Sequence, residues 1–151
     1  MKLGVRLEEP DRTLADEYLR KAERAFDAME TLEKNPEWCV AAAYYAMYFS
    51  LSAILMRAGI TSKIHTCTIA LMELFDFTQE EIERMERAMH ARIEAQYALD
   101  PDVEIEEIIE YAPRFSLRCR TVMLELDDAR IEKIRKRIAS ERSPDTPTDP
   151  S

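Results

Sequence analysis

Glycine is nearly absent from this chain, which contains only two glycines among its 151 residues. Valine is also scarce, whereas alanine, leucine, methionine, glutamate and arginine are plentiful. The plentiful residues favour helices, while β-branched residues such as valine favour strands. The composition therefore predicts an all-α protein, and the length is that of one domain with a substantial core.

Paired cysteines and an excess of positive charge are missing as well. The formal net charge is −9, which argues against binding a nucleic-acid duplex by electrostatics alone but leaves a local basic site open. Cys39, Cys67 and Cys119 form no CxxC or Cys/His pair of the kind that holds zinc. We therefore expect reduced thiols, a cytoplasmic protein, and neither metal nor cofactor.

Charge is missing altogether from one stretch, Cys39 to Met56, which is 18 residues long. A helix that is apolar around its whole circumference must be covered on all sides, either by lipid or by other helices. Eighteen residues is the short end of a membrane span, and neither a flanking Lys/Arg cluster nor the basic n-region of a signal peptide is present. The stretch therefore predicts a buried central helix and no contact with a membrane.

Apolar residues at spacings of three and four predict further helices around this one. A capping box at Thr78 and Glu81 opens one of them, and Gly59 is a natural stop for the central helix. Pro113 lies inside the last apolar pattern, so we expect a kink or break there. The predicted helices span about 11–35, 36–58, 64–75, 78–97 and 105–137.

The two ends of the chain lack such patterns. Residues 1–10 read as an N-terminal arm, and the proline-containing residues 140–151 read as a disordered tail. Residues 11–139 should then form an up-and-down antiparallel bundle of four to five helices. The basic residues between Arg130 and Arg137 are interpreted as a solvated helix end, with nucleic-acid binding as the weaker alternative.

Five blocks of the sequence carry a pattern that goes beyond helix periodicity: Ala43–Phe49, Leu55–Ile60, Lys63–His65, Arg92–Leu99 and Tyr111–Phe115. In this order they resemble the HEPN family, the higher-eukaryote and prokaryote nucleotide-binding domains, in its small stand-alone prokaryotic form. Two positions depart from the usual pattern, because Ile64 stands where the family has Thr and Gln96 where it has Asp. The resemblance covers about residues 11–130.

The resemblance implies an antiparallel helical bundle that usually forms a homodimer. HEPN domains are often paired with a minimal nucleotidyltransferase, as its substrate-binding subunit or as a toxin–antitoxin partner. Many are metal-independent ribonucleases with an Arg-x(4–6)-His motif, in which the histidine performs acid–base chemistry and the arginine holds the phosphate. The implied partners of this chain are a second copy, a nucleotidyltransferase, and a nucleotide or RNA.

The catalytic histidine of that motif looks absent here. Aligned through Arg92, its position falls on Tyr97, and a tyrosine, with a pKa of about 10, is a poor base at neutral pH. Arg92 and Tyr97 are the catalytic candidates by alignment. Arg84 and His90 fit the motif by spacing alone, but residues six apart do not share a helix face, so this pair is the weaker candidate.

The candidates for ligand binding are His65, Arg92, Tyr45 and Tyr97. His65 either fixes a loop by bonding to a tyrosine hydroxyl, or contacts a phosphate at a helix N-terminus. Arg92 is either an exposed arginine paired with an acidic neighbour, or a phosphate holder. Tyr97 is expected to close the bundle.

Tyr44, Tyr45 and Tyr48 lie on more than one face of the central helix, and their hydroxyls need partners if they are buried. Most of them are expected to be core aromatics, and one could stack on a base. Trp38 is interpreted as packing or dimer surface.

We therefore expect a nucleotide- or RNA-binding HEPN-like bundle that is catalytically degenerate and paired with a nucleotidyltransferase. Two alternatives stay open: an active metal-independent ribonuclease toxin, and a dimeric scaffold without a ligand. A ribonuclease requires its arginine and histidine to converge, whereas a binding module requires a polar site without that pair.

Overall fold

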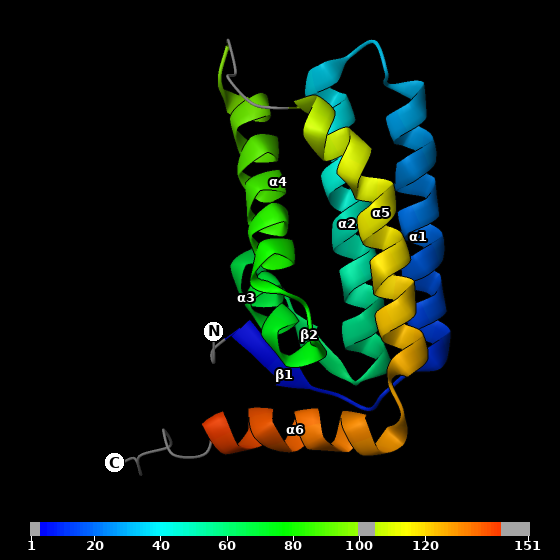
Figure 1. Ribbon diagram of the computed structural model, residues 1–151, viewed down its shortest axis with the longest axis vertical. Coiled ribbons are helices and arrows are strands. Elements are labelled where there is room, and N and C mark those ends of the chain that lie inside the picture. Colours follow the sequence, from blue (N-terminus) through cyan, green and yellow to red (C-terminus); the bar gives the residue numbers. More distant parts are fainter. Residues whose placement is uncertain (1–3, 100–104, 143–151) are drawn as a thin grey trace.

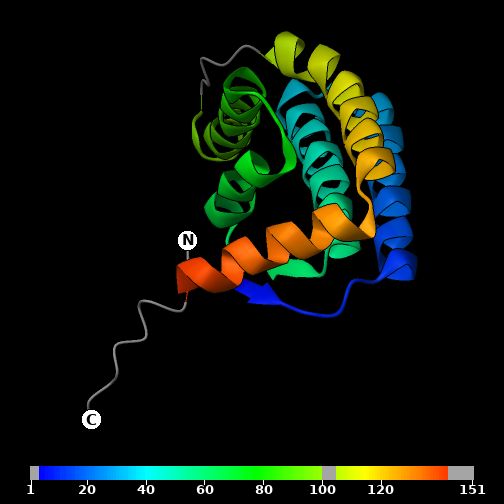
Figure 2. The same cartoon turned by 60° about the horizontal axis from the view of Figure 1, so that its bottom comes forward.

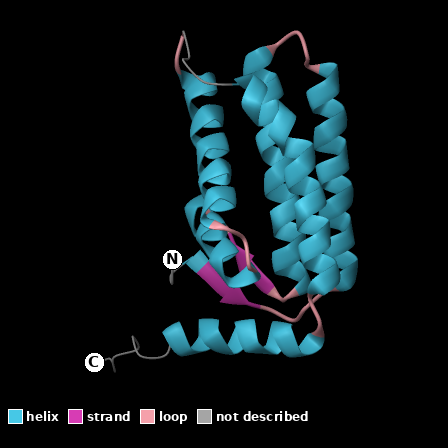
Figure 3. Ribbon diagram, viewed as in Figure 1, coloured by secondary structure: helices cyan, strands magenta, loops and turns pink. Residues whose placement is uncertain are grey.

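The computed structural model describes residues 4–99 and 105–142 as a helical bundle with one small sheet (Figures 1 and 3). The all-α bundle predicted from the sequence is confirmed. Its elements are β1 (Val5–Leu7), α1 (Arg12–Thr31), α2 (Pro36–Arg57), β2 (Ile60–Ser62), α3 (His65–Ala70), the 3-10 helix η2 (Leu71–Phe75), α4 (Gln79–Tyr97), α5 (Ile105–Glu125) and α6 (Asp128–Arg142).

Helix α2 is the centre of the bundle. Helices α1, α4 and α5 pack around it, as Figure 1 shows, and α6 lies across the lower end. By length and composition α2 could also cross a membrane, but 78% of its most apolar 18-residue window is buried inside the protein. The prediction of a central core helix is therefore confirmed.

Polar side chains of α2 satisfy their hydrogen bonds inside the core. The buried Ser50 hydroxyl donates to the Ala46 carbonyl at 2.8 Å and shares a 3.0 Å hydrogen bond with the Ser116 hydroxyl of α5. The buried Cys39 thiol donates to the Met29 carbonyl of α1 at 3.3 Å. Because an unpaired buried polar group is costly, these contacts fix how α1 and α5 sit against α2.

The ends of the helices follow the sequence signals. The Thr78 hydroxyl accepts from the Glu81 amide at 3.1 Å, and the Glu81 carboxylate accepts from the Thr78 amide at 2.8 Å, which completes the predicted capping box. Gly59 ends α2 with a φ of +73°, where a side chain would be strained and would also collide with Arg135 and the Glu8 carbonyl.

The predicted last helix is in fact two helices, and the break is not at Pro113. Pro113 lies on the exposed side of α5, so water can satisfy the carbonyl that the proline leaves unpaired, and the helix continues through it. The break comes at Leu126 and Asp127. The Asp127 carboxylate accepts from the Arg130 amide at 2.7 Å, and this N-cap starts α6.

The predicted N-terminal arm contains a strand. Strand β1 pairs antiparallel with β2, with Val5 opposite Ser62 and Leu7 opposite Ile60. These strands are too short to give a clear alternating pattern in the sequence. Figure 2 shows α6 beside this sheet at the lower end of the bundle. Residues 140–142 of the predicted tail continue α6, and residues 143–151 lie outside the described part of the chain.

The predicted helix over 64–75 is divided. It becomes the short α-helix α3 followed directly by η2, whose end at Asp76 has a φ of +63°. The Arg118 side chain of α5 donates to the Asp76 carbonyl at 3.0 Å and to the Glu81 carboxylate at 2.8 Å. Arg118 therefore joins α5 to the turn between η2 and α4.

One arginine connects α6 to the rest of the bundle. The Arg135 guanidinium donates through Nη1 to the carbonyls of Glu8, Ala58 and Gly59, at 2.7, 3.0 and 3.0 Å. Ala58 and Gly59 follow α2 directly, where the helix dipole leaves negative charge. Arg135 therefore holds together α6, the C-terminal end of α2 and the segment after β1.

Replacing Arg135 with alanine should destabilise the protein. Hydrogen bonds from a charged group contribute about 1.5–3 kcal/mol, so we expect the free energy of unfolding to fall by about that amount. Urea denaturation followed by circular dichroism would measure it. Arg137→Ala is the matched control, because within the described residues Arg137 makes only an exposed 3.6 Å ion pair with Glu141 on the same helix. Equal losses of unfolding free energy in the two variants would contradict this role of Arg135.

Candidate functional site

The tyrosines of α2 meet the start of α3. Tyr44 is fully buried, and its hydroxyl shares a 2.7 Å hydrogen bond with His65 Nδ1. The Tyr48 hydroxyl bonds to the Thr68 hydroxyl at 3.1 Å, and the His65 ring stacks on the Tyr48 ring with centroids 4.1 Å apart. Both buried hydroxyls thus find partners on α3, and His65 holds the segment after β2 against the core.

Arg92 of α4 covers the other side of this cluster. Its guanidinium carbon lies 5.0 Å from the centre of the Tyr44 ring and 5.4 Å from that of the half-buried Tyr45. Cations are attracted to the faces of aromatic rings at such distances. The buried Arg92 Nε has no hydrogen-bond partner within the described residues, which is uncommon for a buried donor. We call Tyr44, Tyr45, His65 and Arg92 the Arg92 site.

Gln96, which the resemblance aligns with an aspartate of the HEPN pattern, contacts Arg92. Its side-chain oxygen accepts from Arg92 Nη1 at 3.1 Å. An aspartate or glutamate here would neutralise the arginine, whereas the neutral amide orients the guanidinium and leaves the charge of the pair positive. The departure at Gln96 therefore makes this contact more attractive to an anion.

Burial sets the protonation of the site. Burial, and to a smaller extent the Arg92 guanidinium, lowers the pKa of His65, so its ring is neutral near pH 7. Burial raises the pKa of Tyr44 and of Tyr48, so both keep their hydroxyl protons. As the pH falls below about 6.5, the unfolded chain binds a proton that the folded His65 resists, and the folded state loses stability.

The aromatic surface extends from the Arg92 site towards α1. The Tyr45 ring stacks on Phe49 at 5.7 Å, and Phe49 stacks on Tyr18 of α1 at 6.4 Å. The Lys21 ammonium lies 4.6 Å from the centre of the Phe49 ring. Phe49 and Lys21 were not among the predicted site residues, although Phe49 follows Tyr45 by one helical turn in the same uncharged stretch.

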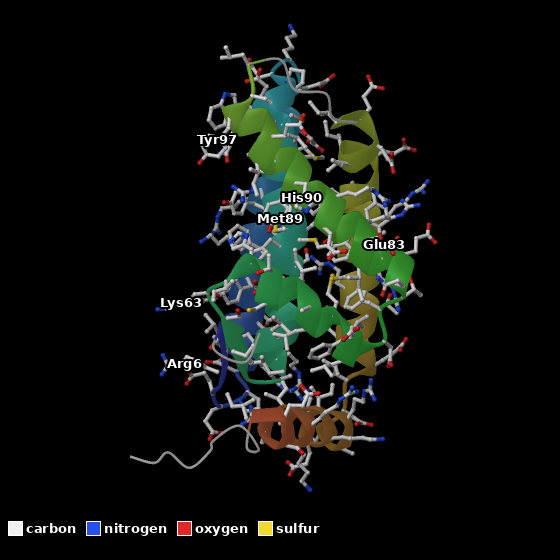
Figure 4. All side chains as sticks on the ribbon, turned by 90° about the vertical axis from the view of Figure 1, so that its left-hand side faces the viewer. Arg6, Lys63, Glu83, Met89, His90 and Tyr97 are labelled. Atoms are coloured by element: carbon white, nitrogen blue, oxygen red, sulfur yellow. The ribbon has the colours of Figure 1, made fainter. Side chains whose placement is uncertain are left out.

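Tyr97 does not close the bundle, because 81% of its surface is exposed. Figure 4 shows it on the side of α4 away from α5. The residues predicted to face inward lie four apart, from Met85 to Ile93 and Tyr97. In a helix of 3.6 residues per turn, each step of four residues advances about 40° beyond one full turn. By the last two turns this stripe faces outward, and Ala91 and Ala95 are the buried residues instead.

The structure does not bring Arg84 and His90 together. Arg84 lies over the Tyr111 ring of α5 at 4.5 Å and pairs with Glu80 at 3.1 Å. His90 is exposed on the outer face of α4 (Figure 4). The histidine that lies near Arg92 is His65, from a different element, and the spacing of residues along α4 could not indicate this pair.

No group of three or more potential metal ligands occurs within residues 4–99 and 105–142. Cys39, Cys67 and Cys119 are free and buried, as the expectation of reduced thiols requires. The only chemistry assembled in the Arg92 site is that of a guanidinium, a neutral imidazole and phenol rings.

The chain belongs to the HEPN domain family. Residues 15–122, which include the whole Arg92 site, match that family. A UPF0332 protein from Archaeoglobus fulgidus is 33% identical over 91 residues, a match that covers 56% of this chain and 73% of the relative. Membership confirms the resemblance seen in the sequence and makes the chain a helical domain of a nucleotide- and RNA-related family.

Replacing Arg92 with glutamine should raise the pKa of His65. Removing a nearby positive charge makes protonation easier, while burial, the larger cause, keeps the pKa below its ordinary value of about 6.5. An NMR titration of the His65 ring in both proteins would measure the change. Arg137→Gln removes the same charge from α6 and should leave the titration where it is. An unchanged or lowered pKa in Arg92→Gln would show that the guanidinium does not act on this ring.

Proposed function

We propose that the Arg92 site binds a nucleotide or single-stranded RNA, and that the chain is a catalytically degenerate HEPN subunit. The observation that carries the proposal is the position of Arg92, whose guanidinium packs on two tyrosine rings and is oriented by a neutral glutamine. An arginine fork of this kind is suited to a phosphate group, because it donates two parallel hydrogen bonds.

The aromatic surface beside Arg92 suits a base. Tyr45 and Phe49 are half-buried, so part of each ring is accessible, and they continue to Tyr18 on α1. Stacking on such rings is tolerant of sequence, because every base has a π-face. Lys21, which lies over the Phe49 ring, adds a second positive charge beside these aromatic rings. The chain is acidic overall, so binding would depend on this local arrangement and not on bulk charge.

The proposal includes a homodimer and a minimal nucleotidyltransferase partner, both in the cytoplasm. Its structural support is a set of exposed apolar side chains, three in or just after the last turns of α4 and one next to His65. These are Ile64, Ile93, Tyr97 and Leu99, with exposed fractions of 48, 39, 81 and 103%. Exposed apolar and aromatic residues of this kind are typical of protein interfaces.

Arg92→Gln and Tyr45→Leu should both weaken binding of a labelled single-stranded RNA, measured by fluorescence anisotropy at fixed salt. Loss of a charge-assisted contact to phosphate should raise Kd about tenfold or more. Loss of one stacking ring should cost about 1–3 kcal/mol. Arg137→Gln controls for the change in net charge and should bind like the wild type. Binding that is unaffected in Arg92→Gln and Tyr45→Leu, or absent from the wild type, would rule out this site.

The proximity of His65 to Arg92 favours ribonuclease activity as a second candidate function. A histidine that is neutral near pH 7 can act as a general base, and the arginine beside it could hold the phosphate. This pair would replace the arginine and histidine that the family motif places on one helix. Such activity would decline as the pH falls through the lowered pKa of His65.

Incubation of the protein with labelled RNA in EDTA separates the two functions. A catalytically degenerate protein should bind RNA and leave it intact. Cleavage that disappears in both His65→Gln and Arg92→Gln would establish the ribonuclease instead. Cleavage that disappears in Arg84→Gln and His90→Gln would assign it to the other motif. If the protein neither binds nor cleaves RNA or nucleotides, the dimeric scaffold without a ligand is the remaining function.

A further inference from the structure

A pocket of about 180 Å³ lies between α2, α4 and α5. None of the four residues of the Arg92 site lines it. Its lining combines four apolar side chains with two arginines, one glutamate and one tyrosine: Met47, Arg84, Arg87, Ala88, Ala91, Glu107, Ile108 and Tyr111.

The pocket exists because α4 presents alanines where it faces α5. Ala88 and Ala91 are buried, with 1 and 5% of their surface exposed, but their side chains are too short to fill the space. The buried Met47 of α2 contributes to the apolar lining, and Ile108 and Tyr111 of α5 add more of it. An apolar cavity of about 150 Å³ is large enough for benzene, so this pocket can take one six-membered ring with a short substituent.

The two arginines of the pocket each have an acidic partner, but the two pairs differ in strength. Arg84 is held by the Tyr111 ring at 4.5 Å and by Glu80 at 3.1 Å. Arg87 and Glu107 are joined only by a 4.0 Å contact, and each side chain is about half exposed. Such a long, solvated ion pair contributes little to stability. A carboxylate brought in by a ligand could therefore replace Glu107 as the partner of Arg87.

The surroundings of the pocket favour a small molecule over a protein segment. A docking helix would need apolar surface continuing beyond the pocket. The large apolar side chains that are exposed within the described part of the chain are Trp38, Ile64, Ile93, Tyr97, Leu99, Leu117 and Leu124, and none of them lines it. The apolar surface is thus confined to the size of one ring, with charge at its edge.

We propose that this pocket binds a small aromatic monocarboxylate. The ring lies among Met47, Ala88 and Ala91, and the carboxylate accepts hydrogen bonds from Arg87. This binding is separate from the function proposed for the Arg92 site and does not depend on it.

The test is a titration of the full chain with phenylacetate, followed by NMR of 13C-labelled methionine and alanine methyl groups. Phenylacetate should shift the methyl signals of Met47, Ala88 and Ala91 in a saturable way. Its neutral analogue, phenylacetamide, should bind more weakly. Arg87→Gln should raise Kd for phenylacetate about fivefold or more, because the charge-assisted hydrogen bonds are lost.

Two further variants make the test sharper. Glu107→Gln removes the competing carboxylate and should lower Kd for phenylacetate by about twofold or more. Ala91→Met fills the pocket and should abolish the binding of both compounds. Arg137→Gln matches the charge change of Arg87→Gln elsewhere and should bind like the wild type.

Three results would overturn the proposal. The first is the absence of saturable shifts at these three methyl groups. The second is equal affinity for phenylacetate and phenylacetamide. The third is an affinity for phenylacetate that is the same in Arg87→Gln, Glu107→Gln and Arg137→Gln. None of these results bears on whether Arg92→Gln weakens RNA binding, so the two proposals can fail independently.

Discussion

The need to cover α2 on every side determines the architecture of this protein. An 18-residue stretch without charge has no face that can be left in water, so α1, α4 and α5 all pack against it. Helices are cylinders, and those arranged around a central one do not fill all the space between them. The Arg92 site is built where α4 and α3 meet the tyrosines of α2, and the alanine-lined pocket is built where α4 faces α5.

The tyrosines connect this core to the chemistry of the surface. A core helix made only of aliphatic residues would need no polar partners, but Tyr44 and Tyr48 carry hydroxyls that must be satisfied when they are buried. The start of α3 provides both partners, His65 and Thr68. His65 is therefore positioned by the packing of the core, and the same burial keeps its ring neutral. The faces of the Tyr44 and Tyr45 rings carry partial negative charge and attract the Arg92 guanidinium.

In the HEPN motif an arginine and a histidine are related by spacing along the chain, and the alignment through Arg92 that the resemblance suggests places Tyr97 at the histidine position. Tyr97 is highly exposed, while His65 of α3 and Arg92 of α4 both lie against the Tyr44 ring. Gln96 further changes the balance of charge around the arginine. The residues that give the site its chemistry thus come from α2, α3 and α4. Their separation along the chain says little about their distance in space.

The sequence by itself determined the helical class, the burial of α2, the glycine stop at Gly59 and the capping box at Thr78, because these depend on local propensity and on periodicity within one element. It also pointed to His65, Arg92 and Tyr45 through the family resemblance. It missed the β1–β2 pairing and led us to expect a kink or break at Pro113, whereas the helix breaks at Leu126 and Asp127. Only the tertiary structure decided that Pro113 faces water, that Tyr97 turns outward, and that Arg92 and His65 both lie against Tyr44. These outcomes depend on which side of one helix packs against another, and a single sequence leaves that choice open.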